Sequence, residues 1–319
     1  MRSFHSLDEI PSDAFPRGTS VAIGKFDGVH RGHQALLARA CELAAEHDLE
    51  SVVFTFFENP QRMLHPELSL NPLMSSQQRL DSFAASGIDT CIMVPFTEDF
   101  AEIPAERFAE QVLSKLLRTR RLSVGPDFRF GFEGAGDTAM LTKLGKRFGF
   151  ELEVIDVIEE GDFGRISSSR VREAITEGDV ADAARLLGHP LELRGTVVRG
   201  DARGRDLGFP TANLGGEIEG MVPAEGIYAG WAVVRGERHP AAISVGNNPT
   251  FTPDAEPRVE AFLLDFDGEL YGEPIRVQFA ERLRGNIVFD GMEALMERMA
   301  EDVRETRAIL SERDASRSV

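Results

Sequence analysis

The segment from Ser20 to Ala45 constrains the fold of this chain more than any other, because it passes from strand to helix across one glycine-rich loop. The apolar run at 20–23 has the β-rich character of a buried strand, and the Ala/Leu-rich stretch at 35–45 has helical length and propensity. Between them lies the decapeptide Gly-Lys-Phe-Asp-Gly-Val-His-Arg-Gly-His, residues 24–33. A loop that follows a strand of an open α/β sheet lies at the carboxyl edge of the sheet, where ligands bind. We therefore predict a ligand-binding loop here.

The residues of this loop suit an anionic ligand. Its glycines at 24, 28 and 32 let backbone N–H groups approach an anion at a helix N-terminus. His30 and His33 can point both imidazoles at one phosphate. In adenylyl transfer the nucleophile is often already an anion, so the enzyme needs hydrogen-bond donors for the charge developing on the α-phosphate more than it needs a base. We predict that the two histidines are those donors; for a bare His-x-x-His, two surface histidines would be the better interpretation.

Strands and helices continue to alternate along the first half of the chain. Further strands are predicted over residues 51–57, 90–95, 122–124 and 152–157, and helices over residues 75–87, 105–117 and 137–148. Strands that alternate with helices predict a mostly parallel, doubly wound α/β sheet of the Rossmann-like type.

After Gly188 the alternation of helices and strands gives way to short strands joined by turns. A short helix over 179–187 is ended by Gly188. Beyond it, strands joined by Gly, Pro and Asn turns are predicted over 191–198, 227–234, 239–245, 259–264 and 275–279, which indicates a small antiparallel β-barrel. A C-terminal amphipathic helix follows, and we expect its methionines to pack against the barrel rather than line a cofactor pocket. We therefore predict two domains, 1–188 and 189–319.

Charge and cysteine content narrow the class of function. A formal net charge of −18 argues against a nucleic-acid-binding surface, but not against ATP, whose charge can be met locally. Cys41 and Cys91 have no metal-ligand spacing and favour reduced thiols. No apolar run has the length of a membrane span and the N-terminus lacks a signal-peptide core, so we predict a cytoplasmic protein without a membrane partner. The sequence leaves the oligomeric state open.

Two strings of the first half resemble the nucleotidylyltransferase superfamily, in particular bacterial FAD synthetases. The first is Gly-x-Phe-Asp-Gly-x-His-x-Gly-His at 24–33, and the second is Ile-Ser-Ser-Ser-Arg-Val-Arg at 166–172, which is similar to the family's Ile-Ser-Ser-Thr-x-Ile-Arg. The resemblance implies His30 and His33 as catalytic residues. It also implies residues that bind ATP and its phosphates: Gly24, Phe26, Asp27, Gly28, Ser168, Ser169 and Arg172. On residue type alone, the three serines are also a helix N-cap.

A third string, Gly-Pro-Asp-Phe-Arg-Phe-Gly at 125–131, looks like the family's flavin loop and implies flavin contacts from Asp127 and Phe128, with Asp127 also near metal. Two positions depart from the family. Phe56-Phe57-Glu58-Asn59-Pro60 stands where the family usually carries Asp-Pro-His-Pro, so we assign this loop no catalytic part. Lys25 stands where a small or amide residue is frequent, and a solvated lysine and a phosphate contact are equally good interpretations.

The second half resembles riboflavin kinases through Gly-Phe-Pro-Thr-Ala-Asn at 208–213. The resemblance implies that Thr211 and Asn213 coordinate the Mg²⁺ of ATP, whose hardness suits oxygen ligands, and that the segment ending at Gly208 lies over phosphates. Glu260, in a strand similar to the family's Val-Glu-x-x-Leu-Leu-Asp-Phe, is the candidate base, because the neutral 5′-hydroxyl of riboflavin must lose a proton.

The final helix matches the family pattern, but the segment before it does not. Asp302 and Arg307 fit the family pattern, and Arg307 is implied to bind flavin. Gly285-Asn286 departs from it, because an acidic residue is common there.

Together the strings identify the chain as a member of the bifunctional riboflavin kinase and FMN adenylyltransferase family. The resemblance implies a nucleotidylyltransferase domain followed by a riboflavin kinase barrel, with ATP, riboflavin and FMN as small-molecule partners, FAD as product and Mg²⁺ as cofactor. Two alternatives stay open: a nucleotidylyltransferase for another phosphorylated small molecule, and a flavin-binding sensor without turnover. A class I aminoacyl-tRNA synthetase is disfavoured by the acidic charge.

Overall fold

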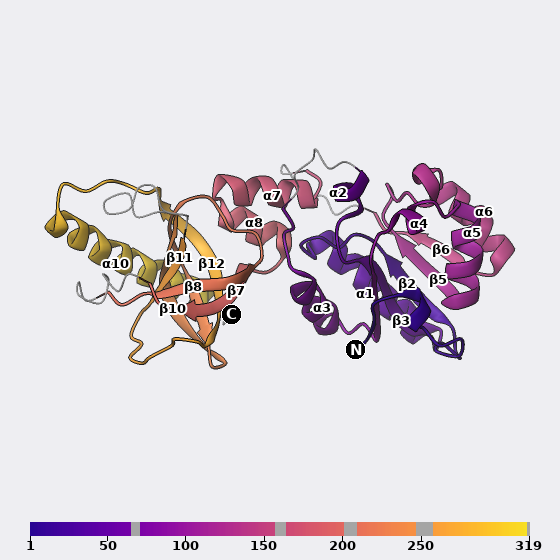
Figure 1. Ribbon diagram of the computed structural model, residues 1–319, viewed down its shortest axis with the longest axis horizontal. Helices are drawn as coiled ribbons and strands as arrows, with labels where there is room; N and C mark the ends of the chain where they lie inside the picture. Colours follow the sequence, from indigo (N-terminus) through magenta and orange to yellow (C-terminus); the bar gives the residue numbers. More distant parts are fainter. Residues whose placement is uncertain (65–70, 157–163, 201–208, 247–257, 318–319) are drawn as a thin grey trace. The chain divides into compact units, whose positions relative to one another are not determined.

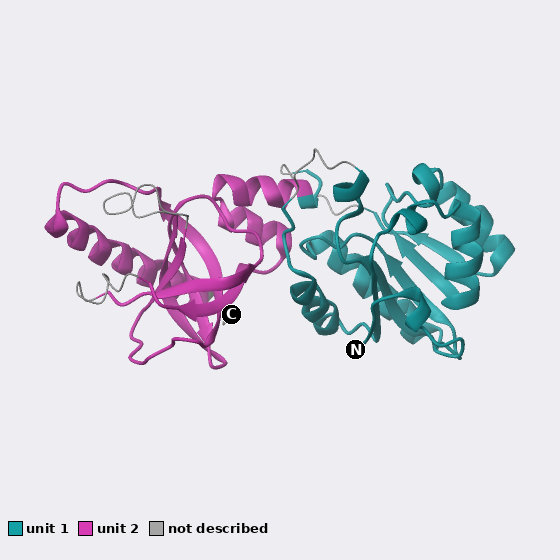
Figure 2. Ribbon diagram, viewed as in Figure 1, with its two compact units in different colours: residues 1–168 teal, residues 169–319 magenta. Residues whose placement is uncertain are grey.

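The chain forms two compact units, residues 1–168 and 169–319 (Figures 1 and 2). The computed structural model describes residues 1–64, 71–156, 164–200, 209–246 and 258–317. Helices α7 (Ser168–Glu177) and α8 (Val180–Leu187) fall almost wholly in the second unit. The division of the sequence into domains at Gly188 stays a prediction.

The first unit is built on a parallel sheet with strand order β1-β4-β3-β2-β5-β6, in which every neighbouring pair is parallel. The six strands are β1 (Arg2–Phe4), β2 (Thr19–Ile23), β3 (Glu50–Phe56), β4 (Thr90–Val94), β5 (Thr119–Val124) and β6 (Glu151–Val154). The helices and helical turns that connect them are η1 (Leu7–Glu9), α1 (Arg31–Glu46), α2 (Pro60–Leu64), α3 (Ser76–Ala85), α4 (Glu98–Ala101), α5 (Ala105–Arg107), η2 (Phe108–Leu116), η3 (Phe132–Gly134) and α6 (Thr138–Phe148). The predicted Rossmann-like sheet is confirmed.

Helices cover both faces of this sheet, as the residue pattern of its strands requires. Along β2, Val21 and Ile23 pack in one apolar cluster with residues of η2 and α6, whereas Ala22 packs in another with residues of α1. Successive side chains of a strand point to opposite faces, so a strand buried on both faces is mostly apolar, and the polar residues buried in β2 are the small Thr19 and Ser20. This explains the short apolar runs from which the strands were predicted.

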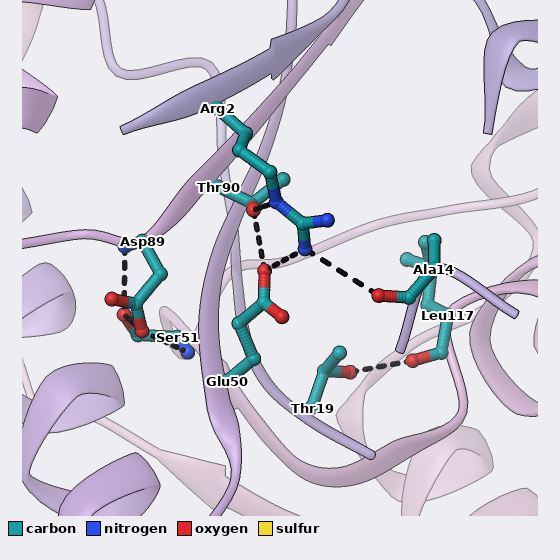
Figure 3. A network of polar contacts seen from close by, with 8 residues as sticks. All are labelled: Arg2, Ala14, Thr19, Glu50, Ser51, Asp89, Thr90 and Leu117. Carbon is teal, nitrogen blue, oxygen red and sulfur yellow. Dashed lines mark hydrogen bonds and ion pairs between the residues drawn. The ribbon is translucent and has the colours of Figure 1, made fainter. Parts of the chain in front are cut away.

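The amino edge of the sheet is tied by a polar network (Figure 3). Arg2 of β1 pairs with Glu50 of β3 and donates through Nε to Thr90 Oγ1 of β4 at 3.2 Å. Asp89 accepts hydrogen bonds from Ser51 N at 3.0 Å and Ser51 Oγ at 2.7 Å. The loop at 24–30 follows the end of β2, so it lies at the opposite, carboxyl edge of the sheet.

The second unit contains a closed barrel in which the strands follow the order β10-β11-β8-β7-β12-β9 and neighbours are antiparallel. Its strands are β7 (Leu191–Val198), β8 (Ala212–Glu219), β9 (Gly226–Val234), β10 (Glu237–Gly246), β11 (Arg258–Leu263) and β12 (Pro274–Arg284). Helix α10 (Met292–Arg317) ends the chain and contacts β9, β10 and β12. The predicted barrel with a C-terminal helix is confirmed. Among the described helices, none has the length and apolar character needed to cross a membrane.

Besides short helices and turns such as α2 and α4, three local features differ from the sequence-based prediction. Strand β1 was not predicted, because three residues carry too little periodicity. Strand β8 was not predicted either, because its Asn213, Gly215 and Gly216 are typical of turns. The helix predicted over 105–117 is a short α-helical turn followed by the π-helix η2, in which Leu117 N donates to Val112 O at 2.9 Å, five residues back.

The barrel leaves no room for a side chain at Gly230 of β9. A Cβ there would lie 2.1 Å from Gln278 O and 2.6 Å from Ile243 Cδ1. We expect Gly230→Ala to lower the free energy of unfolding of the barrel by about 3 kcal/mol, since backbone must move. The fluorescence of Trp231, the only tryptophan of the chain, measures this during a urea titration. Gly285→Ala is the control, because its Cβ would meet nothing within 4 Å; equal effects of the two changes would contradict the prediction.

Candidate functional site

The loop after β2 takes a backbone path that few residues adopt. Phe26, Gly28 and Val29 all have positive φ angles, of 50°, 84° and 42°. A non-glycine residue in this region costs about 1–3 kcal/mol and persists only where the surroundings fix it. The Phe26 side chain is fully buried against Phe83, so only its backbone is available to a nucleotide. The predicted contact of Phe26 with ATP therefore concerns its main chain.

This path brings the two histidines together at the start of α1. His30 is the N-cap, and its Nδ1 accepts a hydrogen bond from His33 N at 3.3 Å. The two imidazole rings stack with centroids 3.7 Å apart and planes 14° apart. Gly32 lies close beside them, and a Cβ there would approach the His30 ring to 3.3 Å, a tight contact that would press on the ring. The structure thus brings His30 and His33 to one helix N-terminus, as predicted.

Burial keeps both histidines neutral. His30 is 7 % exposed, and burial lowers its pKa to about 4, with the positive charge of Arg165 acting in the same direction and a backbone hydrogen bond opposing it. The pKa of His33 is also well below its usual value, first because of burial and then because of His30. Since His30 Nδ1 accepts a hydrogen bond, the proton of the neutral ring is on Nε2. The pair therefore offers N–H donors without carrying charge.

Asp27 fixes neighbouring segments to the loop. Its Oδ1 accepts a hydrogen bond from Leu73 N at 2.9 Å, and its carbonyl accepts one from Ser168 Oγ at 2.9 Å. Asp27 and Ser168, far apart in the sequence, thus lie next to each other, and the part of Ser168 in binding phosphate stays a prediction. Ser169 and Arg172 follow on α7 in the second unit, and their part in binding phosphate stays a prediction.

Sequence reasoning missed Arg165. Its guanidinium pairs with Asp127 of the predicted flavin loop, and its charge acts on the pKa of His30. The only sequence feature that could have pointed to it is its position directly before the Ile-Ser-Ser-Ser motif that begins at residue 166. Phe128, also predicted to touch flavin, is half-buried and stacks on Phe130 with centroids 5.9 Å apart. The flavin contacts of Asp127 and Phe128 stay predictions.

In the barrel, two cavities meet at Thr211. One, of about 200 Å³, is mostly polar and is lined by residues that include Gly200, Asn213, Asp267, Glu269 and Tyr271. The other, of about 160 Å³, is mostly apolar. Thr211 lines both, and its hydroxyl donates to Glu260 Oε2 at 2.8 Å. Glu260 itself lines the apolar cavity, so its carboxylate is hydrogen-bonded to the residue that the two cavities share.

Asn213 fits a divalent cation held beside the polar cavity. Its side chain is 8 % exposed, and its Oδ1 has no hydrogen-bond partner among the described residues. A Cβ on Gly200 would lie 2.6 Å from the Asn213 amide, so this approach requires glycine. An amide oxygen and a hydroxyl are oxygen donors, which Mg²⁺ prefers, and Mg²⁺ commonly takes few protein ligands besides substrate phosphates. Gly208, predicted to bind phosphate, lies outside the described residues.

The apolar cavity is walled by aromatic side chains and by α10. Phe209, Phe262 and Phe289 line it, together with Met299 of α10. Met299 therefore lines a cavity as well as lying on the helix that covers the barrel, and the expectation that the methionines do not line a cofactor pocket stays a prediction. Asn286, one of the departures from the family, lines the cavity too and donates to Val245 O at 3.2 Å.

A buried ion pair joins the cavity wall to α10. Arg284 donates to both oxygens of Asp302, at 3.0 and 2.7 Å, and both residues line the cavity. Arg307, in contrast, is absent from the described cavity lining and makes two 2.6 Å hydrogen bonds to Asp265. Its flavin contact stays a prediction.

Two known protein families match two successive parts of the chain. Residues 12–170 match the FAD synthetase family and residues 187–310 match the riboflavin kinase family. Three relatives named bifunctional riboflavin kinase/FMN adenylyltransferase come from Listeria monocytogenes, Escherichia coli and Pseudomonas fluorescens. They are 34 %, 35 % and 36 % identical over 91 %, 95 % and 92 % of this chain and 92 %, 95 % and 93 % of their own.

A solved structure shares the whole fold. A crystal structure from Streptococcus pneumoniae, named a macrolide-efflux protein, has a TM-score of 0.85 and 33 % identity over 96 % of this chain and 98 % of its own. That name describes the pneumococcal protein and is not transferred to this chain. By sequence along nearly its full length, the chain belongs to the family of bifunctional riboflavin kinase/FMN adenylyltransferases.

Proposed function

We infer that the protein phosphorylates riboflavin to FMN with ATP, and then joins FMN to AMP from a second ATP to form FAD and pyrophosphate. The observation that carries this inference is that the two matched families fall on the two compact units, each with a site suited to its own reaction. The two free cysteines suit a reducing compartment, and we place the enzyme in the cytoplasm.

For the kinase reaction, we propose that ATP occupies the polar cavity and riboflavin the apolar one. The aromatic walls formed by Phe209, Phe262 and Phe289 suit a flavin ring. The acceptor is a neutral hydroxyl, so the reaction needs a group that takes its proton. Glu260, at the junction of the cavities, accepts that proton, while its hydrogen bond from Thr211 holds the carboxylate in place.

Thr211 and Asn213 would hold the Mg²⁺ that accompanies ATP. An ion held by these two residues would supply positive charge to the phosphate oxygens during transfer. Asn213 pairs with Glu260 across β8 and β11, so its amide and the carboxylate lie on adjacent strands at the same register. The two strands thereby keep the cation ligand and the base at a fixed separation.

For the adenylyl transfer, the nucleophile is a phosphate of FMN, which needs no base. The oxygen of that phosphate attacks the α-phosphorus of ATP, the bond to the β-phosphate oxygen breaks, and pyrophosphate leaves. The charge that develops on the α-phosphate needs donors, and His30 Nε2–H and the His33 ring supply them. Ser168, Ser169 and Arg172 are proposed to hold the remaining phosphates, with Asp127 and Phe128 at the flavin.

The whole reaction sequence can be followed in one time course. We expect purified protein with riboflavin, ATP and Mg²⁺ to accumulate FMN first and FAD later, resolved by chromatography. Omitting Mg²⁺ in the presence of EDTA is the control and should stop both steps. A protein that binds flavin but consumes no ATP would contradict the proposal and favour the sensor.

The two activities should be lost separately, because their catalytic groups lie in different units. We expect His33→Ala to lower FAD formation from FMN by about 100-fold or more while riboflavin phosphorylation continues. We expect Glu260→Ala to do the reverse when FMN is supplied. Initial rates of each half-reaction measure this, and a folded variant that lost both activities would contradict the division of labour.

The burial of neutral His30 should make stability depend on pH. Its pKa is about 4 in the folded chain and about 6.5 when unfolded, so the unfolded state binds an extra proton between these values. Stability from this group is complete above pH about 6.5 and is lost as the pH falls towards about 4, with a slope approaching about 1.4 kcal/mol per pH unit.

His30→Asn should remove that slope, since asparagine keeps an N-cap acceptor but does not titrate. Urea unfolding followed by far-UV circular dichroism at several pH values measures the difference. His5→Asn, at an exposed position of the same unit, is the control. Parallel pH profiles of wild type and His30→Asn would contradict a buried neutral His30.

A further inference from the structure

Arg79 is a buried cation in an unfavourable place. It lies in the first turns of α3, whose N-cap is Ser75, and it is only 5 % exposed. A positive charge near a helix N-terminus is opposed by the helix dipole, and burying it costs desolvation. Burial accordingly lowers the pKa of Arg79, while the charge of Asp27 acts in the opposite direction. Hydrogen bonds from the guanidinium must offset this cost.

Those contacts are to backbone carbonyls at the carboxyl edge of the sheet. Nη1 donates to Phe56 O at 2.8 Å and to Lys25 O at 3.3 Å, and Nη2 donates to Phe57 O. Among the described residues, no carboxylate forms an ion pair with Arg79. The planar fork therefore spans the ends of two strands, β2 and β3, which a single ammonium group could not do.

The Lys25 peptide is the start of the loop that carries the histidines. Its carbonyl accepts a second hydrogen bond, from Thr55 Oγ1 at 3.2 Å. The loop then passes through the positive φ angles of Phe26, Gly28 and Val29 and reaches His30 as the N-cap of α1. Strained backbone of this kind holds its path only when flanking contacts fix it.

We propose that Arg79 is a positioning residue for the adenylyl transfer: it fixes the loop at Lys25 so that His30 and His33 stand where the charge on the α-phosphate develops. Arg79 does not itself touch the reacting atoms. The proposal rests on the proposed function of the first unit and adds to it a residue outside both sequence motifs. It assigns Arg79 no part in the kinase reaction.

The two activities of one polypeptide provide the test. We expect Arg79→Met to lower kcat for FAD formation from FMN by about 100-fold, since a displacement of about 1 Å can cost that much. The KM for ATP should change by less than about threefold, because the histidines act on charge that develops in the transition state. Arg79→Lys, which keeps the charge but not the fork, should lose about tenfold, and both variants should phosphorylate riboflavin within twofold of wild type.

Arg120→Met is the matched control. Arg120 is an exposed arginine of the same unit that also donates to a carbonyl, Gly149 O, at 3.5 Å. It should leave both activities within twofold. Spectra of protein labelled with ¹⁵N-histidine add a direct readout: in Arg79→Met, but not in Arg120→Met, the His30 ring should lose the signature of an Nδ1 that accepts a hydrogen bond.

Rates are compared per folded molecule, with the folded fraction taken from circular dichroism at the assay temperature. Adenylyl transfer by folded Arg79→Met within twofold of wild type would overturn the proposal, and so would an equal fall of both activities. If Arg79→Met does not fold, Arg79→Lys decides by the same criteria. A wild-type protein that makes no FAD from FMN would instead overturn the proposed function, before any variant is made.

Discussion

Carbonyl groups at the ends of buried parallel strands must find hydrogen-bond donors, and the way this chain supplies them shapes its first site. Beyond the ends of β2 and β3 the hydrogen bonds between the strands stop. There Arg79 donates to the carbonyls of Lys25 and Phe56, and Thr55 donates to the carbonyl of Lys25. An unsatisfied buried carbonyl costs about 1–3 kcal/mol, so these contacts hold the strained loop in its path. The stacked, uncharged histidine pair is the result.

The two sites differ because their nucleophiles differ. A phosphate that is already an anion needs hydrogen-bond donors, and we propose that the buried neutral imidazoles supply these without the cost of burying charge. A neutral hydroxyl needs a base, and we propose for this role Glu260, whose carboxylate lines the apolar cavity. The Arg284–Asp302 pair anchors α10 over the apolar cavity, so the C-terminal helix forms part of the cavity wall as well as packing on the barrel.

Local patterns predicted most of the fold, since parallel strands buried on both faces and amphipathic helices leave strong periodic signals. Elements whose signal is weak or ambiguous were missed. Strand β1 is three residues long, and β8 contains glycines and an asparagine that are typical of turns, yet its pairing with β7 and β11 closes the barrel. The π-helix η2 has the composition of an α-helix, because a one-residue change in hydrogen-bond register leaves no mark on composition.

The residues by themselves determined the family and the two-part architecture and indicated candidate groups for each site, because glycine-rich loops, paired histidines and Thr-Ala-Asn strings are local and specific. They did not determine which groups meet. That Arg79 reaches Lys25, that Arg165 pairs with Asp127, and that Arg307 turns to Asp265 depend on partners far away in the chain. The protonation of His30 likewise follows from burial. Burial and long-range pairing are properties of the packed chain, and no window of sequence contains them.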